Sequence, residues 1–177
     1  MIDLPTLIVV SGPAGTGKTR LAHVLASAIG CPAICRDEIK EGMVHAQASE
    51  FHATTGDALT KRTFPLFFDV LRVLLAGGVT VVGEAAFQDR NWRVGLAPLL
   101  PLAKLRVIQC TAAHEVARER VARRMAEPTR AAHADAEWLE RTATQFDRLS
   151  LPAPTLVVDT TSGYVPELSA IATFAIS

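Results

Sequence analysis

One stretch of the sequence constrains the fold more than any other, and it reads Gly12-Pro13-Ala14-Gly15-Thr16-Gly17-Lys18-Thr19. This stretch matches the phosphate-loop pattern G-x-x-x-x-G-K-[ST] at every fixed position. An apolar run typical of a buried strand, residues 7–10, precedes it, and residues 20–26 after it are typical of a helix. A strand, a glycine-rich turn and a helix in this order direct several backbone N–H groups at one anion. The sequence therefore predicts that residues 12–19 bind the phosphate groups of a nucleotide, rather than forming a turn without a ligand.

The composition favours a globular α/β protein. The chain has 177 residues, of which 49% are apolar, enough for one domain with a sheet covered by helices on both faces. The formal net charge is zero, which disfavours a protein whose main ligand is a nucleic-acid backbone. The N-terminus has no signal-peptide pattern, and charged residues and a Gly-Gly pair interrupt the most apolar window, residues 65–83. We therefore expect a single cytoplasmic domain over residues 1–177, with no membrane segment.

Short β-rich runs alternate with longer helical patterns along the chain. We expect strands at residues 6–10, 33–35, 79–83, 105–110 and 155–158, and helices at 18–28, 38–46, 57–76, 90–100, 113–125, 135–149 and 165–175. This alternation is typical of βαβ units, so it predicts a three-layer α/β fold with a parallel sheet. Residues at about 120–138 are expected to form either a small helical lid over the nucleotide or an ordinary connection.

Two carboxylates follow predicted strands. Ligands of an open α/β sheet bind at the carboxyl ends of its strands, so Asp37 and Glu84 are expected at the same edge as the phosphate loop. Asp37 is suited to accept the proton of an attacking hydroxyl, or else it only caps the helix that follows it. Glu84 is expected to associate with Mg²⁺ or with a polar group of the phosphate acceptor. The alternative for Glu84 is an ordinary exposed glutamate at the end of a strand.

Cationic side chains are expected to hold the phosphates. In a phosphate loop, Lys18 reaches the β- and γ-phosphates, and the hydroxyl of Thr19 helps to hold Mg²⁺. Arg120 and Arg124 lie four residues apart and share one helix face, and guanidinium groups are suited to neutralise a transferring phosphoryl group. We expect at least one of Arg120, Arg124 and Arg130 to contact phosphate, unless these arginines form salt bridges on a surface helix.

The acceptor site is expected in the variable segment 45–63 and in the helix after it, which carry no transferable pattern. Phe64, Phe67 and Phe68 in that helix either line an apolar pocket or pack in the core, the more ordinary outcome for aromatic residues on one helix face. The last predicted strand and its exit, residues 155–161, are expected to border the adenine pocket.

These motifs together resemble one family. The set comprises the phosphate loop, Cys35-Arg36-Asp37-Glu38-Ile39-Lys40, residues 81–87 with 90–93, and Arg120-x₃-Arg124. It resembles the small AAA-annotated P-loop kinase family, which is related to polynucleotide kinases, zeta toxins and chloramphenicol phosphotransferases. The resemblance covers about residues 5–160. It implies five parallel strands in the nucleoside-kinase order, ATP with Mg²⁺ as the phosphate donor, Asp37 as the base and Arg124 in the lid.

Two positions depart from the family pattern. Lys40 stands where polynucleotide kinases carry a substrate-facing arginine, and a lysine cannot make the same bidentate contact. Glu84 stands where aspartate is commoner. From its position, the resemblance implies that Lys40 contacts the substrate. The replacement of arginine by lysine at this position disfavours a nucleic-acid acceptor.

The leading prediction is an ATP-dependent phosphotransferase that moves the γ-phosphate of ATP to a hydroxyl of a small molecule. The alternatives are a polynucleotide or nucleotide 5′-hydroxyl kinase, and a non-catalytic switch in which ATP orders loops that a partner reads. Asp37 and the Arg120–Arg124 pair favour the enzyme. The sequence does not indicate an oligomeric state.

Overall fold

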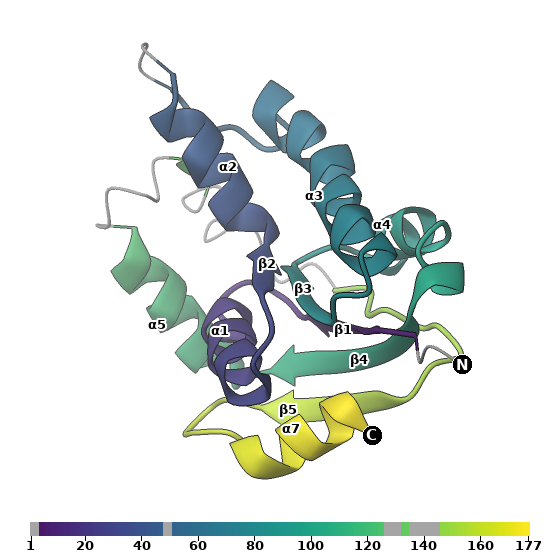
Figure 1. Ribbon diagram of the computed structural model, residues 1–177. Helices are drawn as coiled ribbons and strands as arrows, with labels where there is room; N and C mark the ends of the chain where they lie inside the picture. Colours follow the sequence, from purple (N-terminus) through teal and green to yellow (C-terminus); the bar gives the residue numbers. More distant parts are fainter. Residues whose placement is uncertain (1–3, 48–50, 126–131, 135–145) are drawn as a thin grey trace.

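The computed structural model of the chain describes residues 4–47, 51–125, 132–134 and 146–177. Strands and helices alternate along these residues, as Figure 1 shows. The strands are β1 Thr6–Ser11, β2 Ala33–Cys35, β3 Val81–Ala85, β4 Lys104–Thr111 and β5 Thr155–Asp159. The helices are α1 Lys18–Ile29, α2 Arg36–His45, α3 Ala58–Ala76, α4 Asp89–Leu96, the short 3-10 helix η1 Leu100–Leu102, α5 His114–Arg124 and α7 Leu168–Ile176.

The five strands form one sheet in the order β2-β3-β1-β4-β5, and every neighbouring pair is parallel. This confirms the predicted α/β fold and the nucleoside-kinase strand order that the family resemblance implied. Because all strands run the same way, their carboxyl ends meet at one edge of the sheet. The arrowheads of β4 and β5 in Figure 1 point toward α5, so α5 lies at that edge. Ligands of open α/β sheets bind at this edge.

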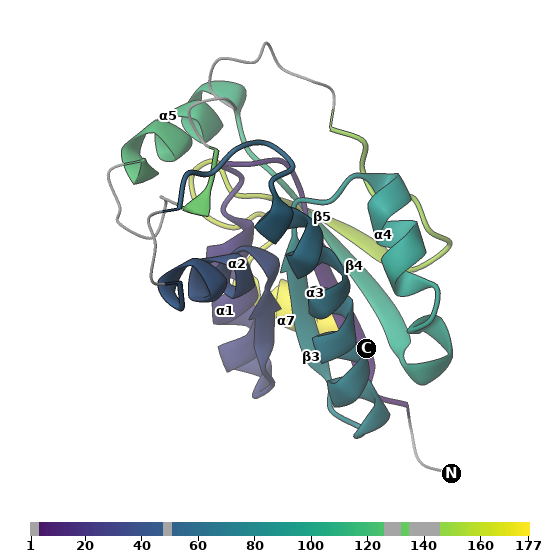
Figure 2. The ribbon, with the colours of Figure 1, turned by 90° about the horizontal axis from the view of Figure 1, so that it is seen from above.

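Helices cover both faces of the sheet, which gives the predicted three layers (Figures 1 and 2). Along β1, Leu7 and Val9 pack in one core with residues of α3 and α4, whereas Ile8 and Val10 pack in a second core with residues of α1 and α7. Successive residues of a strand point to opposite faces, so a run of four apolar residues serves both cores. The central strand is therefore buried from both sides.

Several helix boundaries differ from the prediction for local reasons. α2 begins at Arg36, directly after β2, rather than at Glu38. α4 ends at Leu96, two residues before Pro98, whose missing N–H cannot continue a helical ladder. Most of the predicted helix at 135–149 and of the predicted lid at about 120–138 lies outside the described residues. Residues 146–149 have no regular secondary structure, and residues 120–124 belong to α5. Among the helices described, none has both the length and the apolar character needed to cross a membrane.

Candidate active site

The phosphate loop connects β1 to α1 with the geometry that the motif requires. α1 starts at Lys18, immediately after Gly17, so the unpaired N–H groups of its first turn adjoin the loop. The Thr16 hydroxyl donates a hydrogen bond to the Pro13 carbonyl at 2.8 Å, and the Lys18 ammonium donates to the same oxygen at 3.0 Å. These bonds hold the loop in a compact curve around the N-terminus of α1. Such an arrangement is suited to bind phosphate oxygens.

Gly15 has a structural requirement that the motif does not specify, because it occupies a variable position of the pattern. Its φ of +79° lies in the left-handed region, and a Cβ at this position would overlap the backbone carbonyl of Ala117 in α5. Only glycine satisfies both conditions without strain. The loop is therefore packed directly against the backbone of α5, which fixes the distance between the loop and the arginines of that helix.

Glu84 lies under the loop, at the carboxyl end of β3 beside Val10 of β1. The Thr19 hydroxyl donates a hydrogen bond to Glu84 Oε2 at 3.2 Å, and the Lys18 ammonium is 4.0 Å from Glu84 Oε1. Burial raises the pKa of Glu84 to about 7, although the charge of Lys18 and the Thr19 hydrogen bond oppose this change. Glu84 is 3% exposed, so it is not an ordinary surface glutamate.

The oxygens of Thr19 and Glu84 fit the coordination of Mg²⁺. Mg²⁺ prefers hard oxygen ligands in octahedral geometry, in which adjacent ligand atoms are separated by about 2.9 Å. The hydroxyl of Thr19 and the carboxylate of Glu84 are 3.2 Å apart and lie beside the phosphate loop. A divalent cation would also favour the ionised form of the buried carboxyl group. The structure thus places Thr19 and Glu84, the two residues predicted to bind Mg²⁺, next to each other.

Asp37 is the second residue of α2, and its position excludes the predicted role as a helix cap. The N-cap of α2 is Cys35, and no side chain caps the helix there. Arg36 donates a hydrogen bond from its guanidinium to Asp37 Oδ1 at 2.9 Å. Partial burial opposes ionisation of Asp37, but the charges of His133, Arg36 and Lys18 together hold its pKa below the usual value. Because 42% of its side chain remains exposed, the carboxylate can still meet a ligand.

His133 lies against Asp37, a contact that the sequence did not predict. Its Nδ1 is 3.9 Å from Asp37 Oδ2, and its Nε2 is 2.8 Å from Glu41 Oε1, so the ring lies between two carboxylates of α2. Its side chain is 8% exposed. The sequence around His133 has no motif or periodicity, and only the expected lid at 120–138 included it. No local signal could have assigned it to Asp37.

The two arginines of α5 have different surroundings. The guanidinium of Arg120 donates to the backbone oxygens of Gly15, Thr160 and Thr161, at 3.4, 2.7 and 3.2 Å. It therefore links α5 to the phosphate loop and to the exit of β5. Arg124 lies one helical turn further along and lines the same cleft as Arg120. Arg130, the third predicted arginine, lies outside the described residues.

The structure does not bring Lys40 to the site. Its ammonium donates a hydrogen bond to Asp57 Oδ2 at 2.7 Å, and the two side chains are 3% and 8% exposed. Asp57 also caps α3 by accepting a hydrogen bond from the Thr60 N–H. Lys40 thus ties α2 to the start of α3. Lys40 lines neither of the two clefts at the carboxyl edge of the sheet, and its contact with substrate stays a prediction.

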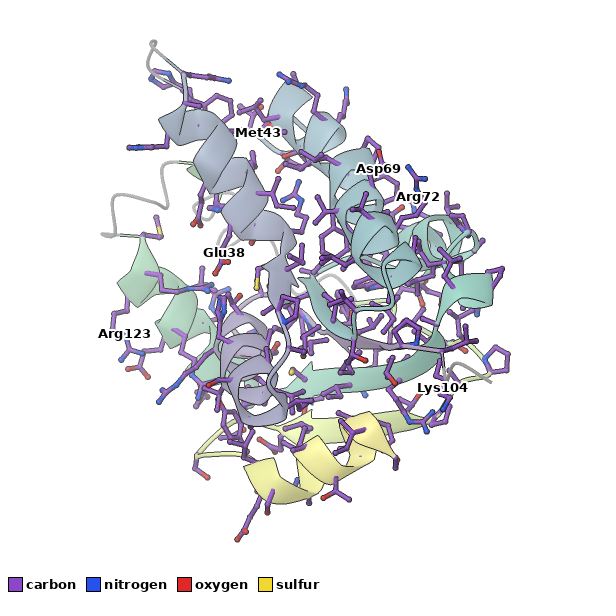
Figure 3. The ribbon with its side chains drawn as sticks, in the orientation of Figure 1. Glu38, Met43, Asp69, Arg72, Lys104 and Arg123 are labelled. Atoms are coloured by element: carbon purple, nitrogen blue, oxygen red, sulfur yellow. The ribbon has the colours of Figure 1, made fainter. Side chains whose placement is uncertain are left out.

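Two clefts open at the carboxyl edge of the sheet. The first cleft has a volume of about 510 Å³ and is lined by residues of the loop and α1, of α2, of α5 and of the exit of β5: Gly15, Gly17, Lys18, Thr19, Arg20, Asp37, Glu38, Glu41, Arg120, Arg123, Arg124, Thr160, Gly163 and Tyr164. Figure 3 shows Glu38 on the side of α2 that faces α1 and α5. From residues 155–161, the predicted border of the adenine pocket, Thr160 lines this cleft.

The second cleft has a volume of about 470 Å³ and lies beside the first. It is lined by Arg36, Asp37, Thr60, Lys61, Phe64, Ala86, Phe87 and Asn91. Among the residues that the structure describes, Asp37 alone lines both clefts. Of the three phenylalanines considered from the sequence, Phe64 lines this cleft, whereas Phe67 and Phe68 are buried in the core.

Comparisons with known proteins agree with this geometry. A protein from Chloroflexus aurantiacus, provisionally assigned as a kinase, is 25% identical with a TM-score of 0.81, and the match covers 97% of this chain and 96% of that chain. A sugar kinase from Janibacter is 17% identical with a TM-score of 0.63, over 96% and 93% of the two chains. The APS kinase from Mycobacterium tuberculosis, in complex with AMPPNP and APS, is 13% identical with a TM-score of 0.62, over 98% and 96%.

The sequence itself matches one family model. No curated protein matches the chain. Residues 7–149, which run from β1 to the segment before β5, match the model described as AAA domain. The chain therefore belongs to the AAA domain family. This confirms the predicted resemblance to the small P-loop kinases of that family.

Proposed function

We propose that the protein is an ATP-dependent kinase that transfers the γ-phosphate of ATP to a hydroxyl group of a small molecule. The observation that carries this proposal is the position of Asp37 at the junction of the two clefts. The first cleft contains the phosphate loop and is the nucleotide site. The second cleft is the acceptor site. A donor and an acceptor bound on the two sides of Asp37 would meet at its carboxylate.

The nucleotide site combines several phosphate-binding groups. The N–H groups of the loop and the ammonium of Lys18 hold the β- and γ-phosphates, and Tyr164 and Thr160 border the nucleoside. Thr19 and Glu84 would hold Mg²⁺, which would neutralise phosphate charge when bound. This assignment is supported by the fit of the two oxygens to an octahedral cation. A cation at this position would also stabilise the ionised form of the buried Glu84 carboxyl group.

Asp37 acts as the base in this proposal. Its carboxylate accepts a hydrogen bond from the acceptor hydroxyl and orients its oxygen toward the γ-phosphate. It takes the proton as the new P–O bond forms, while the bond between the γ-phosphorus and the β–γ bridging oxygen breaks and ADP leaves. Arg36 keeps the carboxylate ionised and in place. Arg124 supplies positive charge to the transferring group, whereas Arg120 positions α5 against the loop. Catalysis then rests on positioning and electrostatic stabilisation.

The experiment that tests this function measures binding and transfer separately. Calorimetry with ATP and GTP, with and without Mg²⁺, should detect a nucleotide that binds and a requirement for the cation. ADP release should then be measured with a panel of hydroxylated metabolites, antibiotics and oligonucleotides. Asp37→Asn should abolish acceptor-dependent ADP release and leave ATP affinity nearly unchanged. Asp69→Asn, at an exposed aspartate of α3 labelled in Figure 3, is the matched control and should behave as wild type.

Each other outcome points to a different conclusion. Absence of heat with both nucleotides would refute the nucleotide site. Unchanged transfer by Asp37→Asn would remove Asp37 from the role of base. Oligonucleotide affinity that falls steeply with salt would favour a polynucleotide kinase. Hydrolysis of ATP that no acceptor stimulates would favour a nucleotide-dependent switch.

A further inference from the structure

The second cleft has its own chemistry, which narrows the class of acceptor. It is formed by the start of α3, the segment after β3, the start of α4, and Arg36 with Asp37. Its volume of about 470 Å³ lies within the range of about 300–1,000 Å³ typical of small-molecule sites. The second cleft has an aromatic wall and fewer cationic groups than the first cleft. Its lining therefore indicates which class of acceptor it can bind.

One wall of the second cleft is aromatic and rigid. The rings of Phe64 and Phe87 lie 5.2 Å apart between centroids, and both are partly exposed. Behind them, Phe64 packs edge-on against Phe68 and Phe87 packs against the fully buried Trp92, each at 5.2 Å. Trp92 is fixed in turn by a hydrogen bond from its Nε1 to Ser11 Oγ at 2.9 Å. This wall offers a preformed apolar surface to the flat part of a ligand.

The polar groups of the second cleft carry a net positive charge. Arg36 and Asp37 neutralise each other through their 2.9 Å ion pair, and Arg36 also donates to the Thr60 carbonyl at 3.3 Å. That leaves Lys61, an exposed residue of α3 that forms no ion pair with any part of the chain that the structure describes. Asn91 supplies an amide that can donate or accept hydrogen bonds. One cation without a counter-charge beside an apolar wall favours a ligand with one anionic group.

We propose that the phosphate acceptor is a small hydroxylated organic anion with a flat apolar body. Its apolar body packs on Phe64 and Phe87, its anionic group faces Lys61, and its hydroxyl group reaches Asp37. This inference rests on the proposed kinase function and adds the class of acceptor to it. A neutral aromatic alcohol would leave Lys61 without its partner, and an anionic polyol without an apolar face would leave the two rings exposed.

A matched set of compounds tests each element of the proposal. The probes are para-hydroxymethylbenzoate and mandelate, the neutral amides of both, and gluconate as an anionic polyol. Binding is followed by ligand-observed NMR without nucleotide, and transfer is followed by ADP release with Mg²⁺ and ATP. The aromatic acids should bind more tightly than their amides, by about fivefold, because Lys61 is exposed and an exposed ion pair contributes about 1 kcal/mol or less. Gluconate should bind more weakly than either acid.

Charge-reversal variants identify the residue responsible. Lys61→Glu should abolish the preference for the acids over the amides, because it replaces the attraction by repulsion. Arg62→Glu is the matched control: Arg62 is the next residue, is also exposed and lines neither cleft, so this variant should keep the preference. Both residues are on the surface of α3, so both variants are expected to fold.

The outcomes separate this inference from the proposed function. Equal or tighter binding of the amides, a preference that persists in Lys61→Glu, gluconate as the best ligand, or no saturable binding by any of the five compounds would each overturn the inference. If a neutral compound or an oligonucleotide of the wider panel still accepts phosphate in a reaction that Asp37→Asn abolishes, the kinase function stands and only the acceptor class is wrong. Absence of nucleotide binding would instead refute the function itself.

Discussion

Glu84 should make the stability of the nucleotide-free protein fall as the pH rises. Its carboxyl group is 3% exposed under the phosphate loop, and burial raises its pKa to about 7 from the ordinary value of 4.5. Between these two values the folded protein holds a proton on Glu84 that the unfolded chain has released. The stabilisation from this group is therefore complete below pH 4.5 and is lost as the pH rises through 7.

The expected size of this effect follows from the difference between the two pKa values. At roughly 1.4 kcal/mol for each pH unit, the interval from 4.5 to about 7 corresponds to a loss of about 3 kcal/mol in the free energy of unfolding. Lys18 limits the loss, because its ammonium lies 4.0 Å from Glu84 Oε1 and stabilises the ionised form. Glu84→Gln keeps the shape of the side chain but cannot ionise, so it should remove this part of the pH dependence.

The assay is urea denaturation of wild type and Glu84→Gln at half-unit steps from pH 4.5 to 8, without nucleotide or divalent cations. The difference between the two free energies of unfolding isolates Glu84 from every other titrating group. Glu115→Gln, at an exposed glutamate in the first turn of α5, measures the effect of removing one surface carboxylate. Curves for wild type and Glu84→Gln that stay parallel across this range would refute the reasoning.

Substitutions at Gly15 and at Lys40, each with a control, test two tertiary contacts. Gly15→Ala should destabilise the protein by about 3 kcal/mol or more, since the new Cβ meets the backbone of α5. Gly30→Ala, with a similar φ but open space around it, should cost only about 1–2 kcal/mol; equal costs in thermal unfolding would contradict the close packing. Lys40→Met should cost about 3 kcal/mol in the free energy of unfolding, because it leaves the carboxylate of Asp57 without its cationic partner. Lys40→Met/Asp57→Asn should recover part of that loss in urea denaturation, and no recovery would show that the charge of Asp57 is not the cause.

Much of the fold could be predicted because its signals are local. All five strands were predicted within about two residues of their ends, since short apolar runs between helical patterns specify buried parallel strands. The edge of the sheet at which Glu84 and Thr19 meet also followed from the pattern, because parallel strands end on the same side. The predicted ends of α2 and α4 were less accurate. α2 begins directly after β2, and Pro98 limits the length of α4.

The partners of the charged residues could not be predicted from any local pattern. Lys40 pairs with Asp57 across 17 residues of sequence, and His133 pairs with Glu41 across 92 residues. Phe64, Phe67 and Phe68 lie on one helix, yet only Phe64 reaches the second cleft. Each of these outcomes depends on which elements pack together and at what angle.

By itself, the sequence determined the phosphate loop, the parallel sheet and the edge of the sheet at which Thr19 and Glu84 meet. These depend on backbone preferences and on the two-residue and 3.6-residue periods of strands and helices, all of which act over a few neighbouring positions. Only the tertiary structure decided that Asp37 stands between two clefts, that Gly15 contacts α5 and that Lys40 is buried. Contacts between distant segments depend on the three-dimensional packing of whole elements, and no short stretch of sequence encodes that packing.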